Sequence, residues 1–169
     1  MTDDGLPVHD AERVAAALAA LDPDERPAPT VVGVLLAGGT SSRFGDANKL
    51  RAELDGEPLV RHAARTLLDA DLHEVVAVTG HEAGAVRAAL ADLPVRFVHN
   101  PAYEAGLSTS VARGVRAVTG ADDADGEGDA DVDAAVFLPG DMPAVEPSTV
   151  RRLVDARRAG LGTALAAAH

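Results

Sequence analysis

A stretch rich in glycine and hydroxyl side chains carries the residues best suited to bind an anion. Gly38 and Gly39 open it, three hydroxyl residues follow, and it goes on to Arg43 and Lys49. Paired glycines let backbone N–H groups approach an anion closely, and hydroxyls add further donors. Lys49 is the only lysine of the chain, so a single ammonium stands among arginines. The stretch predicts a polyphosphate-binding loop; its alternative is a tight connection after a strand.

This loop does not match the two best-known phosphate motifs. Five residues separate Gly39 from Gly45, where a Walker loop has four, and no Gly-Lys-Ser/Thr follows. The dinucleotide spacing G-x-G-x-x-G is also absent. The residues therefore indicate anion binding of another type.

Asp141 is the candidate metal ligand. It follows an apolar run and stands between Gly140 and the dipeptide Met142-Pro143. An acid at a strand end can hold Mg²⁺ through one oxygen, while phosphates and waters complete the coordination shell. Capping of a turn is the alternative role.

A second hydroxyl cluster, formed by Ser108, Thr109 and Ser110, opens a predicted helix. Its N–H groups and hydroxyls suit a second anionic group, and N-capping is the equally simple alternative. Among the histidines, His81, which follows Gly80 at a strand end, is the one candidate for a functional role. The sequence shows no Ser-His-Asp set and no cysteine, so acyl transfer and thiolate chemistry are not indicated.

Apolar strands alternate with amphipathic helices from residue 30 onward. The expected strands are Thr30–Ala37, Glu74–Thr79, Val95–Val98 and Ala134–Leu138. The expected helices are Leu59–Ala70, Ala83–Ala91, Leu107–Val118 and one from Pro147 to about Arg158. Uninterrupted apolar strands separated by helices predict a parallel α/β sheet. Ligands bind beyond the C-terminal ends of such strands, where all the candidate loops would meet.

Two segments lie outside this alternation. Residues 1–29 read as an appendage, a helix at Ala11–Leu21 followed by a proline-rich linker, which leaves residues 30–169 as the main domain. Residues 120–133 are acidic and of low complexity, and they do not fit an EF-hand register. We expect them to form a solvated surface loop.

Charge and hydropathy limit the partners. The formal net charge is −12, which disfavours nucleic acid and anionic lipid, and no apolar run is long enough to span a membrane. A cytoplasmic protein is expected. The abundance of Asp over Lys also favours adaptation to high salt, which predicts loss of stability at low KCl; full stability there would contradict it.

Taken together, these motifs resemble one family. The run LAGGTSSRFG at residues 36–45, with NKL at 48–50, resembles the signature of the MobA-like nucleotidyltransferases, which include the molybdenum cofactor guanylyl- and cytidylyltransferases. The run GDMP at 140–143 resembles their metal-binding loop. The segment from Asn100 to Gly114 resembles the cytidylyl branch, whereas the double glycine is commoner on the guanylyl side.

The resemblance implies a Rossmann-like, three-layer α/β/α fold of the nucleotide-diphospho-sugar transferase type. It implies that an acceptor phosphate attacks the α-phosphate of CTP or GTP, with Mg²⁺ present and pyrophosphate released. Arg43 and Lys49 would neutralise the β- and γ-phosphates, and Asp141 would hold the metal. The implied nucleotide-binding residues are Leu36, Ala37, Gly38, Gly39, Thr40, Ser41, Arg43, Lys49 and Gly80. Ser108, Thr109 and Ser110 would face the acceptor.

Three functions remain open at this point. The first is transfer to molybdopterin, the second is transfer to a sugar- or alcohol-phosphate, and the third is nucleotide binding without catalysis. Family members continue past the metal loop with further strands, while this chain ends soon after the helix near Arg158. Three explanations are open: the second half is shortened, a partner supplies it, or the chain is incomplete and inactive. The partner would be a second copy in a homo-oligomer or another protein.

Overall fold

The computed structural model describes residues 11–20, 29–39, 50, 52–121 and 132–161. The chain divides into two compact units, residues 29–150 and residues 1–28 with 151–169. The first unit carries the sheet and the candidate site. The second contains α1 (Ala11–Ala19), which confirms the predicted N-terminal helix. No described helix is both long and apolar enough to cross a bilayer.

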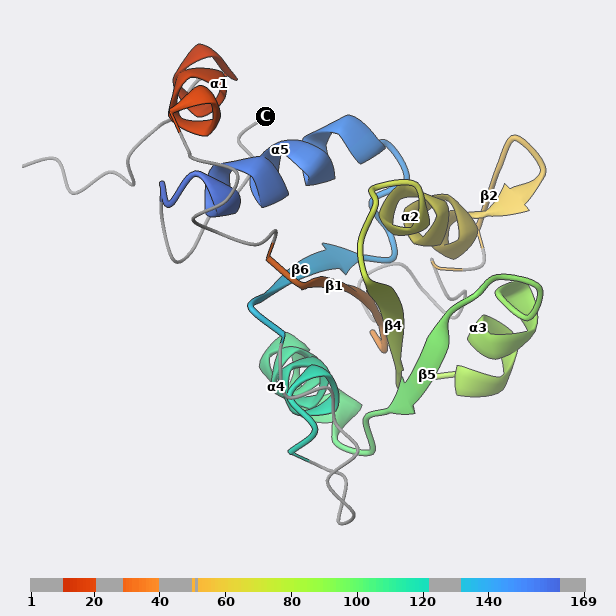
Figure 1. Cartoon of the computed structure of the whole chain (residues 1–169). Coiled ribbons are helices and arrows are strands. Elements are labelled where there is room, and N and C mark those ends of the chain that lie inside the picture. Colours follow the sequence, from red (N-terminus) through yellow and green to blue (C-terminus); the bar gives the residue numbers. More distant parts are fainter. Residues whose placement is uncertain (1–10, 21–28, 40–49, 51, 122–131, 162–169) are drawn as a thin grey trace, which may run out of the picture. The chain divides into compact units, whose positions relative to one another are not determined.

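A four-stranded parallel sheet forms the centre of the first unit (Figure 1). Its strands are β1 (Val31–Ala37), β4 (Glu74–Thr79), β5 (Arg96–His99) and β6 (Ala134–Pro139). They are arranged in the order β5-β4-β1-β6, and every pairing is parallel. All four predicted strands are confirmed, and their observed ends lie within one residue of the predicted ones. The fold is the expected Rossmann-like α/β type.

The predicted helices are confirmed as α2 (Leu59–Leu68), α3 (Ala83–Ala89), α4 (Leu107–Val118) and α5 (Pro147–Arg158). Two of them end two residues earlier than predicted. In α2 the chain leaves the helix at Asp69, whose N–H still donates to the carbonyl of Arg65. Asp71 then takes a positive φ of 56°, which a continuing helix does not permit.

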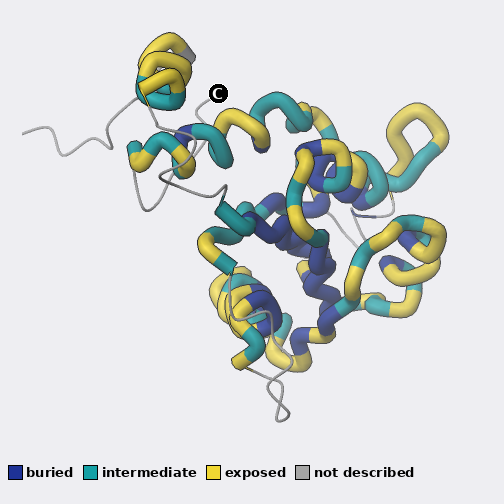
Figure 2. Tube along the Cα trace, in the orientation of Figure 1, coloured by how far each residue is buried: buried dark blue, intermediate teal, exposed yellow. Residues whose placement is uncertain are grey.

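The sheet is covered on both faces (Figures 1 and 2). Alternate residues of β1 point to opposite sides, so Leu35 packs with residues of α2 and α3, whereas Val34 packs with residues of α4. All seven residues of β1 are buried. Burial on both faces explains why the strand is an unbroken apolar run.

Gly114 lets α4 lie unusually close to the sheet. A Cβ placed on it would stand 2.7 Å from Cγ1 of Val34 and 3.2 Å from Cε1 of Phe137. Contacts below 3 Å are not tolerated without movement of one partner. The glycine is therefore required by packing against β1 and β6.

A short antiparallel hairpin, β2 (Glu53–Leu54) and β3 (Glu57–Pro58), precedes α2. Its turn residues Asp55 and Gly56 both have positive φ, 54° and 81°, as tight hairpin turns require. Strand β3 was not predicted, because Pro58 reads equally well as the first turn of the following helix.

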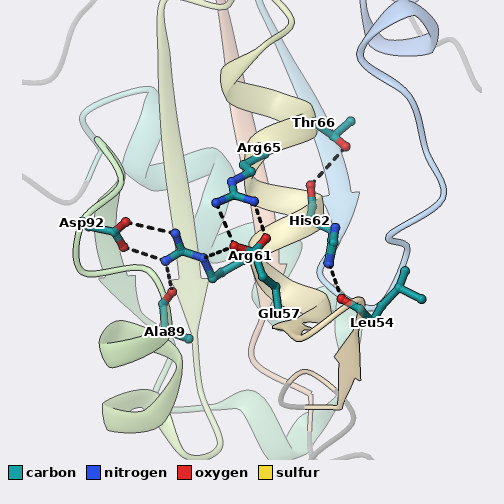
Figure 3. A network of polar contacts seen from close by, with 8 residues as sticks. All are labelled: Leu54, Glu57, Arg61, His62, Arg65, Thr66, Ala89 and Asp92. Carbon is teal, nitrogen blue, oxygen red and sulfur yellow. Dashed lines mark hydrogen bonds and ion pairs between the residues drawn. The ribbon is translucent and has the colours of Figure 1, made fainter.

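A polar network joins α2 to this hairpin and to the loop after α3 (Figure 3). Arg61 donates to both carboxylate oxygens of Asp92, at 2.6 and 3.0 Å, and to the carbonyl of Ala89 at 2.7 Å. Arg65 pairs with Glu57 through both of its terminal nitrogens. The network ties α2 to the hairpin and to the loop after α3. It contains none of the predicted site residues.

The ion pair of Arg61 and Asp92 predicts a contribution to stability that acid removes. The hydrogen bonds from Arg61 lower the pKa of Asp92 from its usual 3.8 to about 2. A carboxyl group with a depressed pKa stabilises the folded state above its unfolded pKa, and this stabilisation disappears as the pH falls through the folded value. Asp92→Asn should thus be less stable than the wild type at neutral pH, with the difference vanishing between about pH 4 and about pH 2. Urea unfolding across that range measures it, with exposed Glu53→Gln as control; a difference independent of pH would contradict it.

Candidate active site

The site lies where the strand order of the sheet reverses direction. From β1 the chain runs to β4 and β5 on one side, and then crosses to β6 on the other. In open α/β sheets, ligands bind beyond the C-terminal ends of the strands at such a switch point. The loop after β1 begins with Gly38 and Gly39, and the turn after β6 contains Gly140 and Asp141. The topology therefore brings the predicted anion loop and the predicted metal ligand together.

Close contacts join the turn after β6 to the end of β1 and to Leu50. The N–H of Gly140 donates to the carbonyl of Leu36 at 2.9 Å. A Cβ on Gly140 would stand 3.0 Å from Cδ2 of Leu50 and 3.3 Å from that same carbonyl oxygen. Leu50 is 5% exposed and belongs to the core, so the chain returns to this edge of the sheet at residue 50. Lys49 immediately precedes Leu50 in the sequence.

Asp141 is exposed in the turn that follows β6. The turn is closed by the N–H of Met142, which donates to the carbonyl of Pro139 at 3.2 Å. Its far end is held by Thr66 of α2, whose buried hydroxyl donates to the carbonyl of Val145 at 2.7 Å. The carboxylate therefore stands on a turn that is fixed at both ends.

Asp141 offers one exposed carboxylate as a ligand for a metal ion. Among the described residues, no three Asp, Glu, His or Cys side chains form a metal-binding group. Mg²⁺ is commonly held by one or two carboxylates, with phosphates and waters filling the remaining positions. Asp141 can provide such a carboxylate, and the residues present fit that mode of binding.

The first glycines of the anion loop lie against the end of β4. Leu36, Ala37 and Gly38 are buried, whereas Gly39 is exposed, and an added Cβ on it would meet no atom of the described residues within 4 Å. The carbonyl of Gly38 accepts a hydrogen bond from the N–H of His81 at 3.3 Å. An added Cβ on Gly38 would lie 3.3 Å from the backbone N of Gly80. Gly38 and Gly80, both predicted nucleotide-binding residues, are therefore neighbours.

Two of the three predicted acceptor-binding hydroxyls are engaged inside the protein. The side-chain amide of Asn100 donates to Oγ1 of Thr109 and to Oγ of Ser110, each at 3.0 Å. The hydroxyl of Thr109 also lies 2.8 Å from the carbonyl of Gly106. Ser108 is exposed. An acceptor-binding role for these residues stays a prediction, with Ser108 the most accessible of the three.

Several predicted residues fall outside the described part of the chain. They are Thr40, Ser41, Arg43 and Lys49. Their assignment to the triphosphate rests on the sequence alone.

The structure also adds residues to the site that the sequence analysis had not assigned to it. Asn100 is 3% exposed, and its side-chain amide organises the loop after β5. Tyr103 packs on Gly80, since an added Cβ there would stand 2.5 Å from Cβ of Tyr103. One available signal was composition, because Tyr103 is the only tyrosine in a chain with three phenylalanines and no tryptophan.

Comparison with known proteins gives concordant results. Residues 33–169 match the MobA-like NTP transferase domain. A probable molybdenum cofactor guanylyltransferase of Haloferax mediterranei is 28% identical over 130 residues, which cover 77% of this chain and 56% of the relative. Nicotine blue oxidoreductase of Paenarthrobacter nicotinovorans is 41% identical over 86 residues, which cover 51% of this chain and 42% of the relative.

The solved structure of a nucleotidyl transferase from Methanothermobacter superposes with a TM-score of 0.61 at 31% identity, covering 75% of this chain and 57% of that one. The chain thus spans only about half the length of these proteins. The domain match nevertheless extends over most of its residues and includes every predicted site residue. The chain belongs to the MobA-like NTP transferase family.

Proposed function

We propose that the protein is a Mg²⁺-dependent nucleotidyltransferase that transfers NMP from CTP or GTP to a phosphorylated acceptor, with molybdopterin as the first candidate. The observation that carries the proposal is the switch point, where the hydrogen bond from the N–H of Gly140 to the carbonyl of Leu36 joins the Asp141 turn to the end of β1, just before the glycine loop. The relative named as a probable molybdenum cofactor guanylyltransferase supports the choice of acceptor.

In this reaction an oxygen of the acceptor phosphate attacks the α-phosphorus of the NTP. A new P–O bond forms, the bond to the oxygen bridging the α- and β-phosphorus breaks, and pyrophosphate leaves with the electron pair. A bound Mg²⁺ would neutralise charge that builds up on the phosphate oxygens. The protein has mainly to position the groups and to supply donors, as in phosphoryl transfer generally.

Each loop has a separate task in this scheme. Gly39 has no side chain that would keep the phosphates away from the backbone, and Arg43 with Lys49 would neutralise the β- and γ-phosphates. Asp141 would hold the metal on the neighbouring turn. A strongly acidic protein, with a net charge of −12, needs such local positive charge to bind an anion.

The direct test incubates the protein with CTP or GTP, Mg²⁺ and molybdopterin and measures pyrophosphate. Release that depends on both nucleotide and molybdopterin supports the proposal. Pyrophosphate release only with a sugar- or alcohol-phosphate would show that this compound, and not molybdopterin, is the acceptor. NTP binding without turnover for any acceptor would contradict catalysis, and absence of NTP binding would overturn the proposal as a whole.

Lys49→Ala should weaken binding of the Mg²⁺–NTP complex by about 1.5–3 kcal/mol, or about 10- to 150-fold, because one charge-assisted contact to phosphate is lost. Isothermal titration calorimetry with CTP and GTP measures the change. Arg116→Ala is the matched control, since it removes one positive charge from the far end of α4. Equal affinity for the Lys49 variant and the wild type would show that the loop does not bind the triphosphate.

A further inference from the structure

Tyr103 occupies an unusual position for an aromatic side chain in this protein. The other two described aromatic residues, Phe97 and Phe137, pack against the two halves of the core. Tyr103 instead begins a short 3-10 helix, η2 (Tyr103–Ala105), just beyond the C-terminal end of β5. It is half-buried. The tyrosine therefore stands at the site edge of the sheet, apart from both core clusters.

His81 lies beside it. The ring centroids of His81 and Tyr103 are 6.1 Å apart, and the ring planes are inclined at 49°. His81 is also half-buried, and its backbone N–H is the donor to the carbonyl of Gly38. The backbone of His81 therefore adjoins Gly38 at the start of the anion loop, and the two rings lie beside each other. We call them the aromatic pair.

The absence of a side chain at Gly80 makes this arrangement possible. An added Cβ on Gly80 would stand 2.5 Å from Cβ of Tyr103, 2.8 Å from its Cγ and 2.6 Å from the carbonyl oxygen of Gly38. Any larger residue would push the tyrosine or the loop away. The glycine thus sets the distance between the tyrosine and the ends of β1 and β4.

A polar network fixes the segment that carries the tyrosine. Oδ1 of Asn100 accepts from the N–H of Ala102 at 3.0 Å, and the hydroxyl of Thr109 lies 3.0 Å from the carbonyl of Ala102. The carbonyl of Tyr103 accepts from the N–H of Gly106 at 3.2 Å. Buried Asn100 ties this segment to the start of α4. The ring is therefore held in place before any ligand binds, which lowers the entropic cost of a contact with one.

We propose that the aromatic pair contacts the nucleobase of the bound NTP, an inference that rests on the proposed function. Under the proposed function, the phosphates would bind at the C-terminal ends of β1 and β6, which are followed by Gly38 and by Asp141. The nucleoside would then extend along the sheet edge toward β4 and β5, where the pair stands. Every base has a π-face that can stack on an aromatic ring, and the ring nitrogens of His81 and the hydroxyl of Tyr103 can also hydrogen-bond a base edge.

The experiment compares a ligand that has a base with one that lacks it. Calorimetric titrations with CTP, GTP and inorganic tripolyphosphate, each with Mg²⁺, are carried out on the full chain. The variants are Tyr103→Leu, Tyr103→Phe and His81→Ala. His99→Ala is the control, because His99 is an exposed histidine at the end of the neighbouring strand. Thermal unfolding of each variant confirms that it is folded.

Tyr103→Leu should weaken binding of CTP or GTP by about 5- to 150-fold, the range measured for base–aromatic stacking, and leave tripolyphosphate binding unchanged. Tyr103→Phe should retain most of the affinity, because the ring remains. His81→Ala should weaken NTP binding in the same selective way, and His99→Ala should not.

Equal NTP affinity for Tyr103→Leu and the wild type would overturn the inference while leaving the proposed function intact. Parallel loss of NTP and tripolyphosphate binding would also overturn it, because the effect would then come from the anion loop. If the wild type binds neither NTP, the proposed function fails, and this inference fails with it.

Discussion

Asp141→Asn is expected to lower the rate of metal-dependent NMP transfer by at least about 100-fold, because the several kcal/mol of charge stabilisation that a bound cation supplies is lost with its ligand. The substituted asparagine would keep the size of the side chain and one oxygen but not the negative charge. The turn itself should persist, since it is closed by backbone groups of Pro139 and Met142 and held by Thr66. Pyrophosphate release at increasing Mg²⁺ measures the effect.

The matched control is Asp71→Asn. Asp71 is exposed and precedes β4, at the opposite edge of the sheet, and asparagine tolerates its positive φ of 56°. This variant loses the same charge without touching the site, so its rate should equal that of the wild type. If the rate of Asp141→Asn is close to that of the control, Asp141 does not hold the metal. If the melting temperature of Asp141→Asn is lowered, the loss of rate comes from a disturbed turn and not from a lost metal ligand.

The second prediction concerns the stability of Gly114→Ala, which should fall although alanine has the higher helix propensity. Glycine inside a helix is usually about 1 kcal/mol worse than alanine, so Gly→Ala should stabilise. At Gly114 we expect the reverse, a destabilisation of about 1–3 kcal/mol, because overpacking a well-filled core carries that cost. The added Cβ would lie 2.7 Å from Cγ1 of Val34, a fully buried residue of the central strand.

Gly84→Ala is the control for this prediction. Gly84 lies in α3, and an added Cβ there would meet no atom within 4 Å in the part of the chain that the structure describes. It should stabilise the protein by up to about 1 kcal/mol, through helix propensity and a less flexible unfolded chain. Urea unfolding of both variants gives the two free energies. Stabilisation by Gly114→Ala would show that α4 is not held as closely to β1 as the structure indicates.

Much of the fold could be predicted because burial on both faces leaves a local trace in the sequence. The strand β1 is an unbroken apolar run, and β6 is apolar up to its proline. The helix α4 was predicted with its observed bounds from its periodicity. The ends of α2 and α3 were placed two residues too far, because apolar residues continue the helical pattern just beyond Leu68 and Ala89. The hairpin strand β3 is too short to leave a periodic signal.

In the candidate site too, some residues could be predicted from the sequence and others could not. Gly38, Gly80 and Asp141 could be named from residue type and position after a strand. The contact of Tyr103 with Gly80, and the role of Asn100, could not, because each joins residues from different segments of the chain. Hydroxyls at a helix start signal an anion site or a structural contact equally well. Only the position of the Asn100 amide shows that Thr109 and Ser110 are already bonded.

By itself, the sequence determined the class of fold, the loops that could bind an anion and a metal, and the family that they resemble. These properties depend on residue type and on spacing along a few consecutive positions. The tertiary structure decided that β1 lies between β4 and β6, so that the glycine loop and the Asp141 turn meet at one switch point. It also decided that a histidine and the only tyrosine stand together beside that loop. Both depend on strand order and on packing between distant segments, which no local pattern specifies.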